Sequence, residues 1–235
     1  MELLFLGRGA AFNTSQGNTA ACIREGERLM LLDCGETVFS ALKERGLLEG
    51  VREVTVAVSH LHSDHCGSLG TLGHYCRYAL GAKLRLVVPE RGDFEERLRM
   101  LLQLFGIDVG PDGVCFIPAG PLGFAAFERL DLVPTRHAEG MTCYSFVMET
   151  AGGGVFYSAD TCTEAPFLDF VRTHPAFERA YMDATSAEGP GIHLPLSRLA
   201  AVTPPALRSR VYLMHVNDAA CLERGRQLGF GCAEV

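Results

Sequence analysis

Short apolar runs alternate with amphipathic segments along the whole chain. Two of the runs, residues 19–24 and 28–32, flank Glu25-Gly26-Glu27 and predict a β-hairpin. The other runs are rich in apolar, β-branched and aromatic residues and predict strands. These runs lie at residues 2–6, 54–59, 84–89, 114–117, 124–137, 142–150, 155–160, 179–184, 211–216 and 232–235.

Segments with apolar residues at helical spacing separate many of these runs. The clearest is residues 94–106, which ends on a glycine, as helices commonly do. The strands and helices alternate without a linker or a low-complexity tract, so the pattern predicts one α/β (α+β) domain over residues 1–235. The other predicted helices lie at residues 36–46, 67–81, 164–174, 196–202 and 218–229.

Composition and charge narrow the class of protein. The chain has 235 residues, of which 48% are hydrophobic and 21% charged, as in an ordinary globular protein. Its net charge of −7 makes a long nucleic acid an unlikely partner, because proteins that bind nucleic-acid backbones usually carry a basic surface. A small anionic substrate would need only a local positive site, which metal ions would supply.

The cysteines and the N-terminus indicate a compartment. The nine cysteines are odd in number and contain no Cys-x-x-Cys pair, which favours reduced thiols over a disulfide framework. The first residues lack the basic start of a signal peptide, and no uncharged apolar run reaches 18 residues. We therefore expect a cytoplasmic protein without a membrane span.

A cluster of polar residues follows the strand predicted at 54–59. His60, His62, Asp64 and His65 fall within six residues. Imidazoles and carboxylates are the usual ligands of zinc and similar ions. An apolar strand needs no such group of polar side chains just past its end, so a metal site explains the cluster better than three exposed loop histidines do.

The order His-x-His-x-Asp-His resembles the signature of the metallo-β-lactamase-fold hydrolases. The resemblance implies a four-layer αβ/βα sandwich with a metal site at one edge of its two sheets. It extends to four residues outside the cluster, of which Asp33 directly follows a predicted strand and the other three lie at the ends of predicted strands. These are Asp33 in LLDCG, His137 at the end of DLVPTRH, Asp160 in VFYSAD and His215 in VYLMHV.

By this resemblance the site holds two divalent metal ions. Zinc is expected, and manganese or iron would suit the same mixture of ligands. Asp160 would contact both metals, and Asp33 would steady the ligands without binding metal itself. The implied ligands are His60, His62 and His137 for the first metal, and Asp64, His65 and His215 for the second.

The late residues also have plainer interpretations when each is taken alone. His137 or His215 would more often be a packed or surface histidine, and Asp160 a turn residue or a helix N-cap. Their joint appearance in the order of the family favours metal binding. Asp160 stands where zinc β-lactamases commonly carry a cysteine, and His62 where the diiron flavoproteins of this fold carry a glutamate, so both of those activities are disfavoured.

A second resemblance concerns the tRNase Z-like phosphodiesterase branch. The segment MDATSAEGPGIHLPLSRLA is similar to its histidine-bearing loop, and FLGRGAAFNTSQGNTAACI, with Asn18, to its beginning. The branch implies that His193 protonates the leaving oxygen or contacts the phosphate. The candidate catalytic residues are His193 and, within the metal cluster, Asp64. Alternatively, His193 is a loop residue beside Gly-Pro-Gly. Glu139 and Asp183 are candidates to orient it.

The resemblance gives hydrolysis but leaves the substrate open. The span from His65 to His137 holds no candidate for the projecting arm with which tRNase Z enzymes grip tRNA. We therefore predict a PhnP-like enzyme that uses a metal-bridging hydroxide on a small phosphodiester, a cyclic phosphate or nucleotide. A thioesterase or lactonase of the glyoxalase II type and an RNA-end nuclease stay open as alternatives. A non-catalytic metal-binding regulator is least favoured, because every ligand is kept. Homodimers are common among such enzymes.

Overall fold

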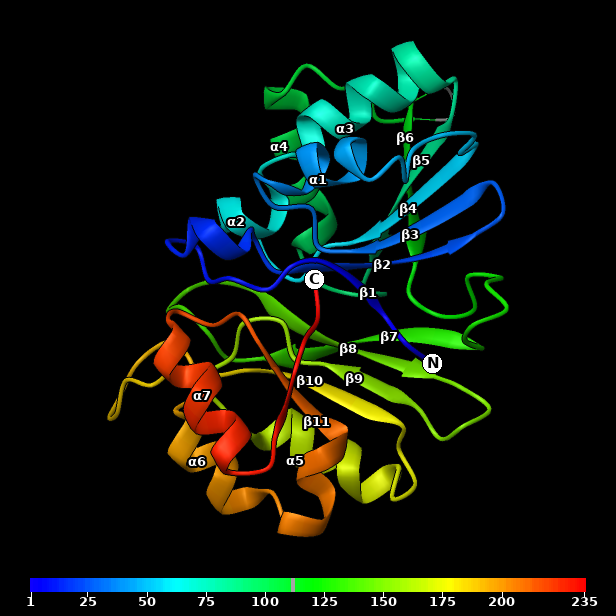
Figure 1. The fold of residues 1–235 in the computed structure, drawn as a ribbon. Helices are drawn as coiled ribbons and strands as arrows, with labels where there is room; N and C mark the ends of the chain where they lie inside the picture. Colours follow the sequence, from blue (N-terminus) through cyan, green and yellow to red (C-terminus); the bar gives the residue numbers. More distant parts are fainter. Residues whose placement is uncertain (111–112) are drawn as a thin grey trace.

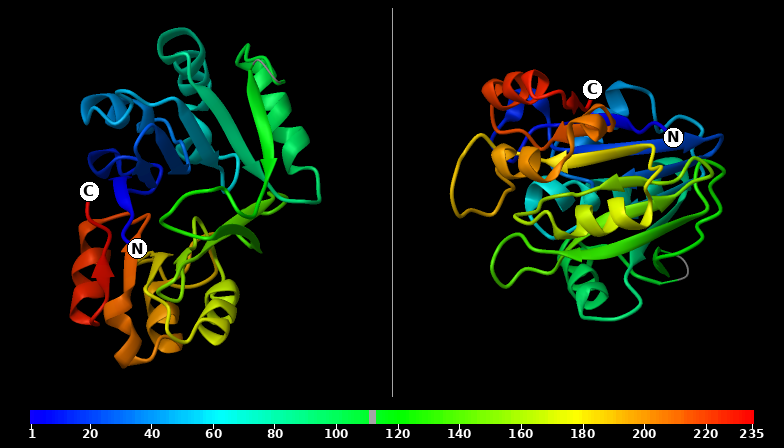
Figure 2. Two further views of the ribbon diagram at one scale, coloured as in Figure 1. Left: turned by 90° about the vertical axis from the view of Figure 1, so that its right-hand side faces the viewer. Right: turned by 90° about the horizontal axis from the view of Figure 1, so that it is seen from below.

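Two six-stranded sheets face each other, and each is covered by helices on its outer side (Figure 1). A computed structural model describes residues 1–110 and 113–235. The turned views in Figure 2 show the same two halves stacked on each other, with the first half of the chain in one and the second half in the other. This arrangement confirms the predicted four-layer αβ/βα sandwich.

The first sheet combines an antiparallel and a parallel part. Its first three strands pair antiparallel and include the predicted hairpin, whereas the next three join in parallel. Parallel strands covered on both faces read as continuous apolar runs, as the sequence here does. In spatial order the strands are β1 (Leu4–Gly7), β2 (Ala20–Glu25), β3 (Arg28–Leu32), β4 (Glu53–Ala57), β5 (Lys83–Val88) and β6 (Val114–Pro118).

The second sheet repeats this plan. Its first three strands pair antiparallel and the following three in parallel. In both sheets, therefore, the parallel strands direct their carboxyl ends to one edge. In spatial order the strands are β7 (Arg129–Thr135), β8 (Cys143–Glu149), β9 (Val155–Tyr157), β10 (Arg179–Asp183), β11 (Val211–Met214) and β12 (Gly231–Cys232).

The helices form the outer layers. The segment predicted as one helix at 67–81 is divided between a short helix and a π-helical turn, Cys76–Leu80, that ends at left-handed Gly81. Within the described ranges, no helix is both long and apolar enough to cross a membrane. The α-helices are α1 (Val38–Glu44), α2 (Ser63–Cys66), α3 (Leu69–Tyr75), α4 (Phe94–Leu104), α5 (Ala165–Thr173), α6 (Leu196–Val202) and α7 (Ala219–Gln227).

Aromatic side chains fill the space between the two sheets. Phe5 of the first sheet packs against Tyr181 and Tyr157 of the second, with ring centroids 4.9 and 6.2 Å apart. On the outer side of the second sheet, Phe156 packs against Phe170 of α5. All of these rings are buried, so the large apolar area that they remove from water holds the layers together.

Most predicted strands differ in their bounds by a few residues. Residues 124–128, predicted as the start of a strand, instead form a turn, because the backbone N–H groups of Ala125 and Ala126 donate to the Glu25 carboxylate at 2.8 Å each. The first strand lies at 4–7 and not 2–6, and the last at 231–232 and not 232–235. Two 3₁₀ helices, Thr14–Gln16 and Pro205–Arg210, were not predicted.

Candidate active site

The candidate site lies where strands of both sheets end. Asp33 follows β3, His60 follows β4, Asp160 follows β9, and His215 directly follows β11. Since these are parallel strands with their carboxyl ends at one edge, the side chains that follow them meet there. His137, two residues after β7, completes the set from the second sheet.

The backbone is strained at this edge. Asp33, Ala159 and His215 have φ values of 66°, 49° and 53°, and apart from glycines they are the only described residues in the left-handed region. That conformation costs about 1–2 kcal/mol for a residue with a side chain. At these strand ends it turns the chain so that Asp33, Asp160 and His215 face inward.

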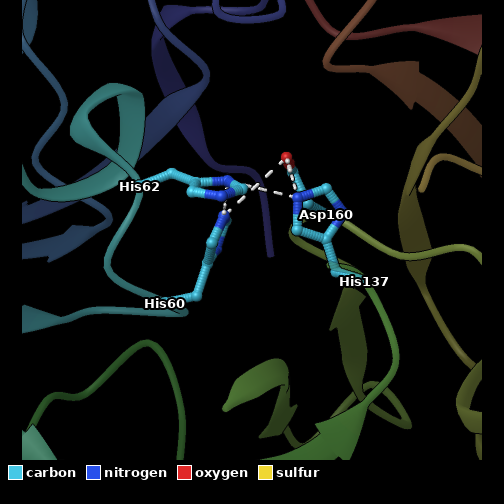
Figure 3. Close-up of side chains that lie close together, drawn as sticks. All are labelled: His60, His62, His137 and Asp160. Atoms are coloured by element: carbon cyan, nitrogen blue, oxygen red, sulfur yellow. Dashed lines mark hydrogen bonds and ion pairs between the residues drawn. The ribbon is translucent and has the colours of Figure 1, made fainter. Parts of the chain in front are cut away.

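Three imidazoles and one carboxylate form the first cluster (Figure 3). His62 Nδ1 lies 3.0 Å from His60 Nε2 and 3.2 Å from His137 Nε2. Asp160 Oδ2 lies 3.5 Å from His137 Nε2 and 3.9 Å from His60 Nε2. Figure 3 shows all four side chains pointing toward one another from the two halves of the fold.

Asp64, His65 and His215 form the second cluster with the same Asp160. His215 Nε2 lies 3.2 Å from Asp64 Oδ2 and 3.3 Å from Asp160 Oδ1, and His65 Nε2 lies 3.1 Å from Asp160 Oδ1. In each cluster the potential ligand atoms all lie within 4.8 Å of one another. The structure thus brings together all seven predicted ligands, in the two predicted groups, with Asp160 in both.

The donor atoms fit divalent cations. His65 Nε2 and Asp160 Oδ1 are buried, and neither has a hydrogen-bond partner among the described residues. Burial, aided by the neighbouring His65, lowers the pKa of His60 well below its ordinary value and favours the neutral imidazole. Burial acts to raise the pKa of Asp160, but His215 and His65 outweigh it and hold that pKa well below the usual range. His60 and Asp160 are thus in the forms that bind metal, neutral imidazole and ionised carboxylate. Burial acts to lower the pKa of His65 and of His215, but the charge of Asp160 outweighs it and raises both, so metal binding at these two imidazoles would release a proton.

Asp33 fixes the orientation of His65 from behind the cluster. Its Oδ2 lies 2.8 Å from His65 Nδ1, so the other ring nitrogen faces the donors. Ser59 completes the arrangement, because its backbone N–H donates to Asp33 Oδ1 at 2.7 Å and its hydroxyl to Oδ2 at 3.0 Å. Asp33 thus contacts the candidate ligand His65 and belongs to neither cluster, which is the position that the resemblance implies for it.

Backbone contacts hold the Asp33 loop against the histidine cluster. Cys34 N donates to the carbonyl of His65 at 2.8 Å, and Ser68 N donates to the carbonyl of Cys34 at 3.0 Å. Gly35 lies so close to Asp64 that an added Cβ would overlap the carbonyl oxygen of Asp64. The absence of a side chain at position 35 therefore allows the two segments to approach.

We expect Asp33→Asn to weaken metal binding by about 10- to 100-fold, the usual effect of losing a hydrogen-bond partner of a metal-binding histidine. Asparagine tolerates the left-handed backbone but presents only one carbonyl oxygen in place of two carboxylate oxygens. Competition with a chromophoric chelator measures the affinity, with Asp169→Asn on exposed α5 as the matched control. Unchanged zinc affinity in Asp33→Asn would show that the contact has no supporting role.

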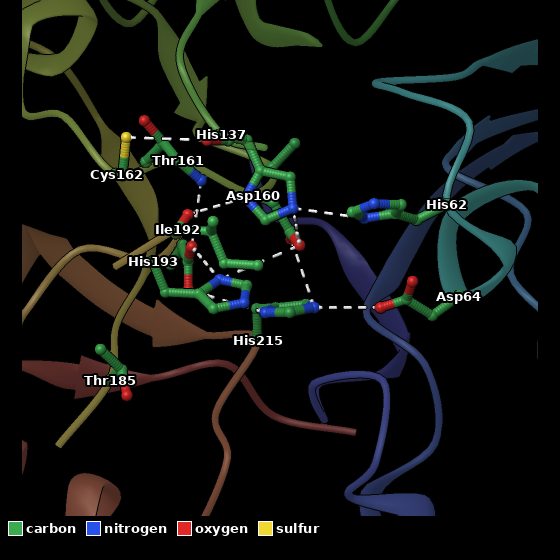
Figure 4. A network of polar contacts seen from close by, with 12 residues as sticks. His62, Asp64, His137, Asp160, Thr161, Cys162, Thr185, Ile192, His193 and His215 are labelled. Atoms are coloured by element: carbon green, nitrogen blue, oxygen red, sulfur yellow. Dashed lines mark hydrogen bonds and ion pairs between the residues drawn. The ribbon is translucent and has the colours of Figure 1, made fainter. Parts of the chain in front are cut away.

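His193 lies beside both clusters (Figure 4). Its ring stacks on His215 with a centroid distance of 5.0 Å, and its Nδ1 lies 2.8 Å from Oδ2 of the fully buried Asp183. Burial acts to lower the pKa of His193, but the hydrogen bond and charge of Asp183 outweigh it and raise that pKa above its ordinary value. Of the two residues suggested to orient His193, Asp183 makes the contact, whereas Glu139 lines a separate hollow beside Leu61 and Arg97.

A cleft of about 440 Å³ opens above the clusters, a size typical of small-molecule sites. Five of the seven candidate ligands and His193 line it, and none of its lining residues is a lysine or arginine. Positive charge for an anionic ligand would therefore come from metal ions and from His193. The remaining lining residues are Ala10, Ala11, Phe12, Ser63, Ile192 and Asn217.

Several residues of the site were not predicted. Ser59 is the last residue of the apolar run at 54–59, and a polar residue in that place was a signal that could have been used. Thr161, whose N–H donates to Asp183 Oδ2 at 3.0 Å, directly follows Asp160. Phe12 and Ile192 lie on loops, where no periodic pattern marks a side chain as part of a cleft.

Comparison with known proteins identifies close sequence relatives. The family model described as anti-Pycsar protein Apyc1 matches residues 1–102 and 121–231. The anti-Pycsar protein Apyc1 of Saccharibacillus brassicae is 31% identical over 233 residues, which cover 93% of this chain and 90% of that protein.

Solved structures share the fold over almost the whole chain. A metallo-β-lactamase-fold protein from Bacillus subtilis has a TM-score of 0.69 at 18% identity, covering 96% of this chain and 90% of its own. A diphosphatase of the PhnP family has a TM-score of 0.72 at 16% identity, and the match covers 99% of this chain and 94% of the diphosphatase. The short form of human tRNase Z has a TM-score of 0.66 at 16% identity, and the match covers 100% of this chain and 96% of the tRNase Z chain. The resemblance stated from the sequence is thereby confirmed.

Proposed function

The chain belongs to the family of anti-Pycsar protein Apyc1, and from this premise we propose that it is a metal-dependent phosphodiesterase. Its substrate would be a small phosphodiester, a cyclic phosphate or nucleotide. The observation that carries the proposal is His193, which is held by a buried carboxylate and opens onto the same cleft as the two donor clusters. Donors for two metals and a separate proton donor suit phosphodiester hydrolysis, because the metals would stabilise the phosphate charge and the proton donor would assist the leaving oxygen.

In this proposal two divalent ions occupy the two clusters, and zinc is expected in preference to manganese or iron. When bound, they supply Lewis-acid stabilisation of the phosphate charge and lower the pKa of water. Asp160 faces both clusters and would be shared between them. The ligands would be His60, His62 and His137 in the first cluster, and Asp64, His65 and His215 in the second, with Asp160 in both.

His193 would protonate the leaving oxygen. Because Asp183 engages Nδ1, the ring nitrogen left for the substrate is Nε2. An alkoxide is a poor leaving group at neutral pH, so a proton delivered to it as the P–O bond breaks lowers the barrier. Asp183 is a positioning residue here, since it keeps the imidazole protonated and fixes its ring without contacting the substrate.

The acidic chain and the small cleft favour a compact substrate over a long nucleic acid. The net charge is −7 and the cleft is lined by neither lysine nor arginine, so a polyanionic backbone would find few partners beyond the metals. A single phosphodiester places one negative charge at the clusters and needs no further cation.

A substrate panel tests the proposal. Metal-loaded protein at one concentration would be given bis(p-nitrophenyl) phosphate, 2′,3′- and 3′,5′-cyclic nucleotides, thioesters and lactones. We expect turnover of the phosphodiesters, with at least one cyclic nucleotide preferred. Turnover confined to thioesters or lactones, or no phosphodiester turnover by protein with full metal content, would overturn the proposal. If the protein instead cleaved RNA ends preferentially, with an affinity that fell steeply as the salt concentration rose, the substrate would be a nucleic acid and not a small phosphodiester.

Asp183→Asn should move the alkaline limit of kcat to lower pH. Asp183 raises the pKa of His193, so the protonated ring persists to higher pH in the wild-type protein. Asparagine keeps the shape but removes the charge, and the acid form is then lost at lower pH. The profile of kcat from about pH 5 to about pH 10 measures the shift, and the ring proton resonances of His193 give its pKa independently. If the alkaline limit of kcat did not move in Asp183→Asn, Asp183 would not be the residue that keeps His193 protonated.

A further inference from the structure

Two apolar side chains stand exposed at the cleft above the donor clusters. Phe12 is 97% exposed and Ile192 is 45% exposed, and both line the cleft. Phe12 has nearly the accessibility of a free side chain, although phenylalanine is usually buried. Packing of the fold therefore does not explain its position.

The turn that carries Phe12 is held in place at both ends. Asn13 N donates to the carbonyl of Ala10 at 2.9 Å and closes the turn. Ala10 N and the side-chain amide of Asn13 both donate to the carbonyl of Val216, at 3.2 and 3.0 Å. Val216 directly follows the candidate ligand His215, so Phe12 has a fixed place relative to the clusters.

Ile192 is tied to the site in a similar way. Its carbonyl lies 2.7 Å from Nδ1 of the candidate ligand His137, and it directly precedes His193. In Figure 4 the Ile192 side chain lies among His137, His193 and Asp160. Two loops far apart in the sequence thus present apolar groups at one cleft. The first is held by Val216, next to the candidate ligand His215, and the second by the candidate ligand His137 itself.

We propose that Phe12 and Ile192 form a subsite for the aromatic base of a nucleotide, with Phe12 as the residue that selects substrates with a base. This inference rests on the proposed phosphodiesterase function. With the phosphodiester at the clusters, the rest of the substrate must extend toward the walls of the cleft, which Phe12 and Ile192 line. An exposed aromatic ring in that wall is a side chain on which a base can stack. Stacking on an aromatic side chain accepts every base, because each has a π-face. The subsite therefore favours nucleotides over base-free phosphodiesters and discriminates little among bases.

Kinetics with matched substrates test the subsite. The pair is the preferred cyclic nucleotide and the cyclic phosphate of methyl riboside, which has the same phosphodiester but no base. For Phe12→Ala we expect KM for the nucleotide to rise about 5- to 150-fold, the range that corresponds to loss of one base–aromatic stack. The kcat value and the KM for the base-free substrate should stay within about twofold. Phe12→Trp should restore the nucleotide KM.

Equilibrium binding gives a second readout that needs no turnover. Calorimetry would compare AMP with ribose 5-phosphate, which differ only by the base. The wild-type protein should bind AMP more tightly, and Phe12→Ala should reduce the difference, with a smaller reduction for Ile192→Ala. Leu104→Ala is the matched control, because Leu104 is 79% exposed on α4 and does not line the cleft.

Three outcomes count against the proposals, and each has a distinct meaning. No turnover of any phosphodiester by the wild-type protein would overturn the proposed function. Turnover of cyclic nucleotides with the same KM and AMP affinity in Phe12→Ala would overturn the base subsite alone. A change from dimer to monomer in Phe12→Ala, with KM unchanged, would assign the exposed ring to contact with a second copy of the chain and would also overturn the subsite.

Discussion

Protein stripped of divalent metal should lose phosphodiester turnover and melt at a markedly lower temperature. The seven candidate ligands come from both halves of the fold, so bound metal would link the two halves. Six of the seven are buried, and the negative charges of the two buried carboxylates, Asp64 and Asp160, would be balanced by the metal ions. At a metal concentration about 1,000 times Kd, binding adds about 4 kcal/mol to the free energy of unfolding. For a chain of this size that corresponds to a melting temperature lower by roughly 8–16 °C after removal of the metal.

Elemental analysis and thermal unfolding of the same sample measure this effect. We expect about two metal ions per chain as purified, and recovery of both activity and melting temperature when zinc or manganese is returned. Magnesium, which prefers an octahedral shell of oxygens, should restore neither fully and serves as the control. Full activity in protein that retains less than about one metal per ten chains would contradict the two-metal site.

His193→Ala should lower kcat for a substrate with an alkoxide leaving group by about 10²- to 10⁴-fold, the usual contribution of a general acid. Metal content should stay unchanged, because His193 belongs to neither of the two proposed ligand sets, and its Nδ1 lies 2.8 Å from Asp183 Oδ2 but 4.0 Å from Asp160 Oδ2. His74→Ala is the matched control, since His74 lies on α3 and lines a different hollow.

The leaving group separates two roles for His193. A p-nitrophenolate leaves without a proton, so loss of a general acid should matter much less for bis(p-nitrophenyl) phosphate than for an alkyl ester. Equal losses on both substrates would mean that His193 only contacts the phosphate. A kcat within about threefold of the wild-type value on the alkyl substrate would exclude both roles.

The local part of the site could be predicted from sequence because its residues are neighbours. His60, His62, Asp64 and His65 follow one buried strand, and a strand end fixes where they point. The alternation of strands and helices likewise predicted one α/β domain, since each strand carries its own apolar run, whereas the division into two sheets came from the resemblance. The ligand cluster and the apolar runs each involve residues that are neighbours in the chain, so both can be recognised in a single sequence.

The distant part depended on resemblance. His137, Asp160 and His215 each follow a strand, but so do other polar residues, and only the order of the family distinguished them. Asp183 shows the difficulty, because in sequence it looks the same as Asp160. The parallel pairing of β10 with β11, which sets Asp183 opposite Met214, brings it beside His215 and His193, and no local pattern reveals that pairing.

Side-chain hydrogen bonds across the fold explain the remaining differences. Residues 124–128 are apolar enough for a strand, yet the Glu25 carboxylate, about a hundred residues earlier, binds their backbone and makes a turn. Phe12 has no apolar period around it, and its exposure became visible only with the turn that anchors it to Val216.

The close approach at Gly35 restricts which sequences can build this site. Position 35 supplies no side-chain ligand or charge, yet every other amino acid would bring a Cβ into the carbonyl of Asp64 and push the Asp33 loop away from His65. A survey of tolerated substitutions would therefore rank this glycine with the metal ligands themselves. Sequences that build this site should therefore be restricted by the space that Gly35 leaves for the carbonyl of Asp64 as well as by the residues that bind metal.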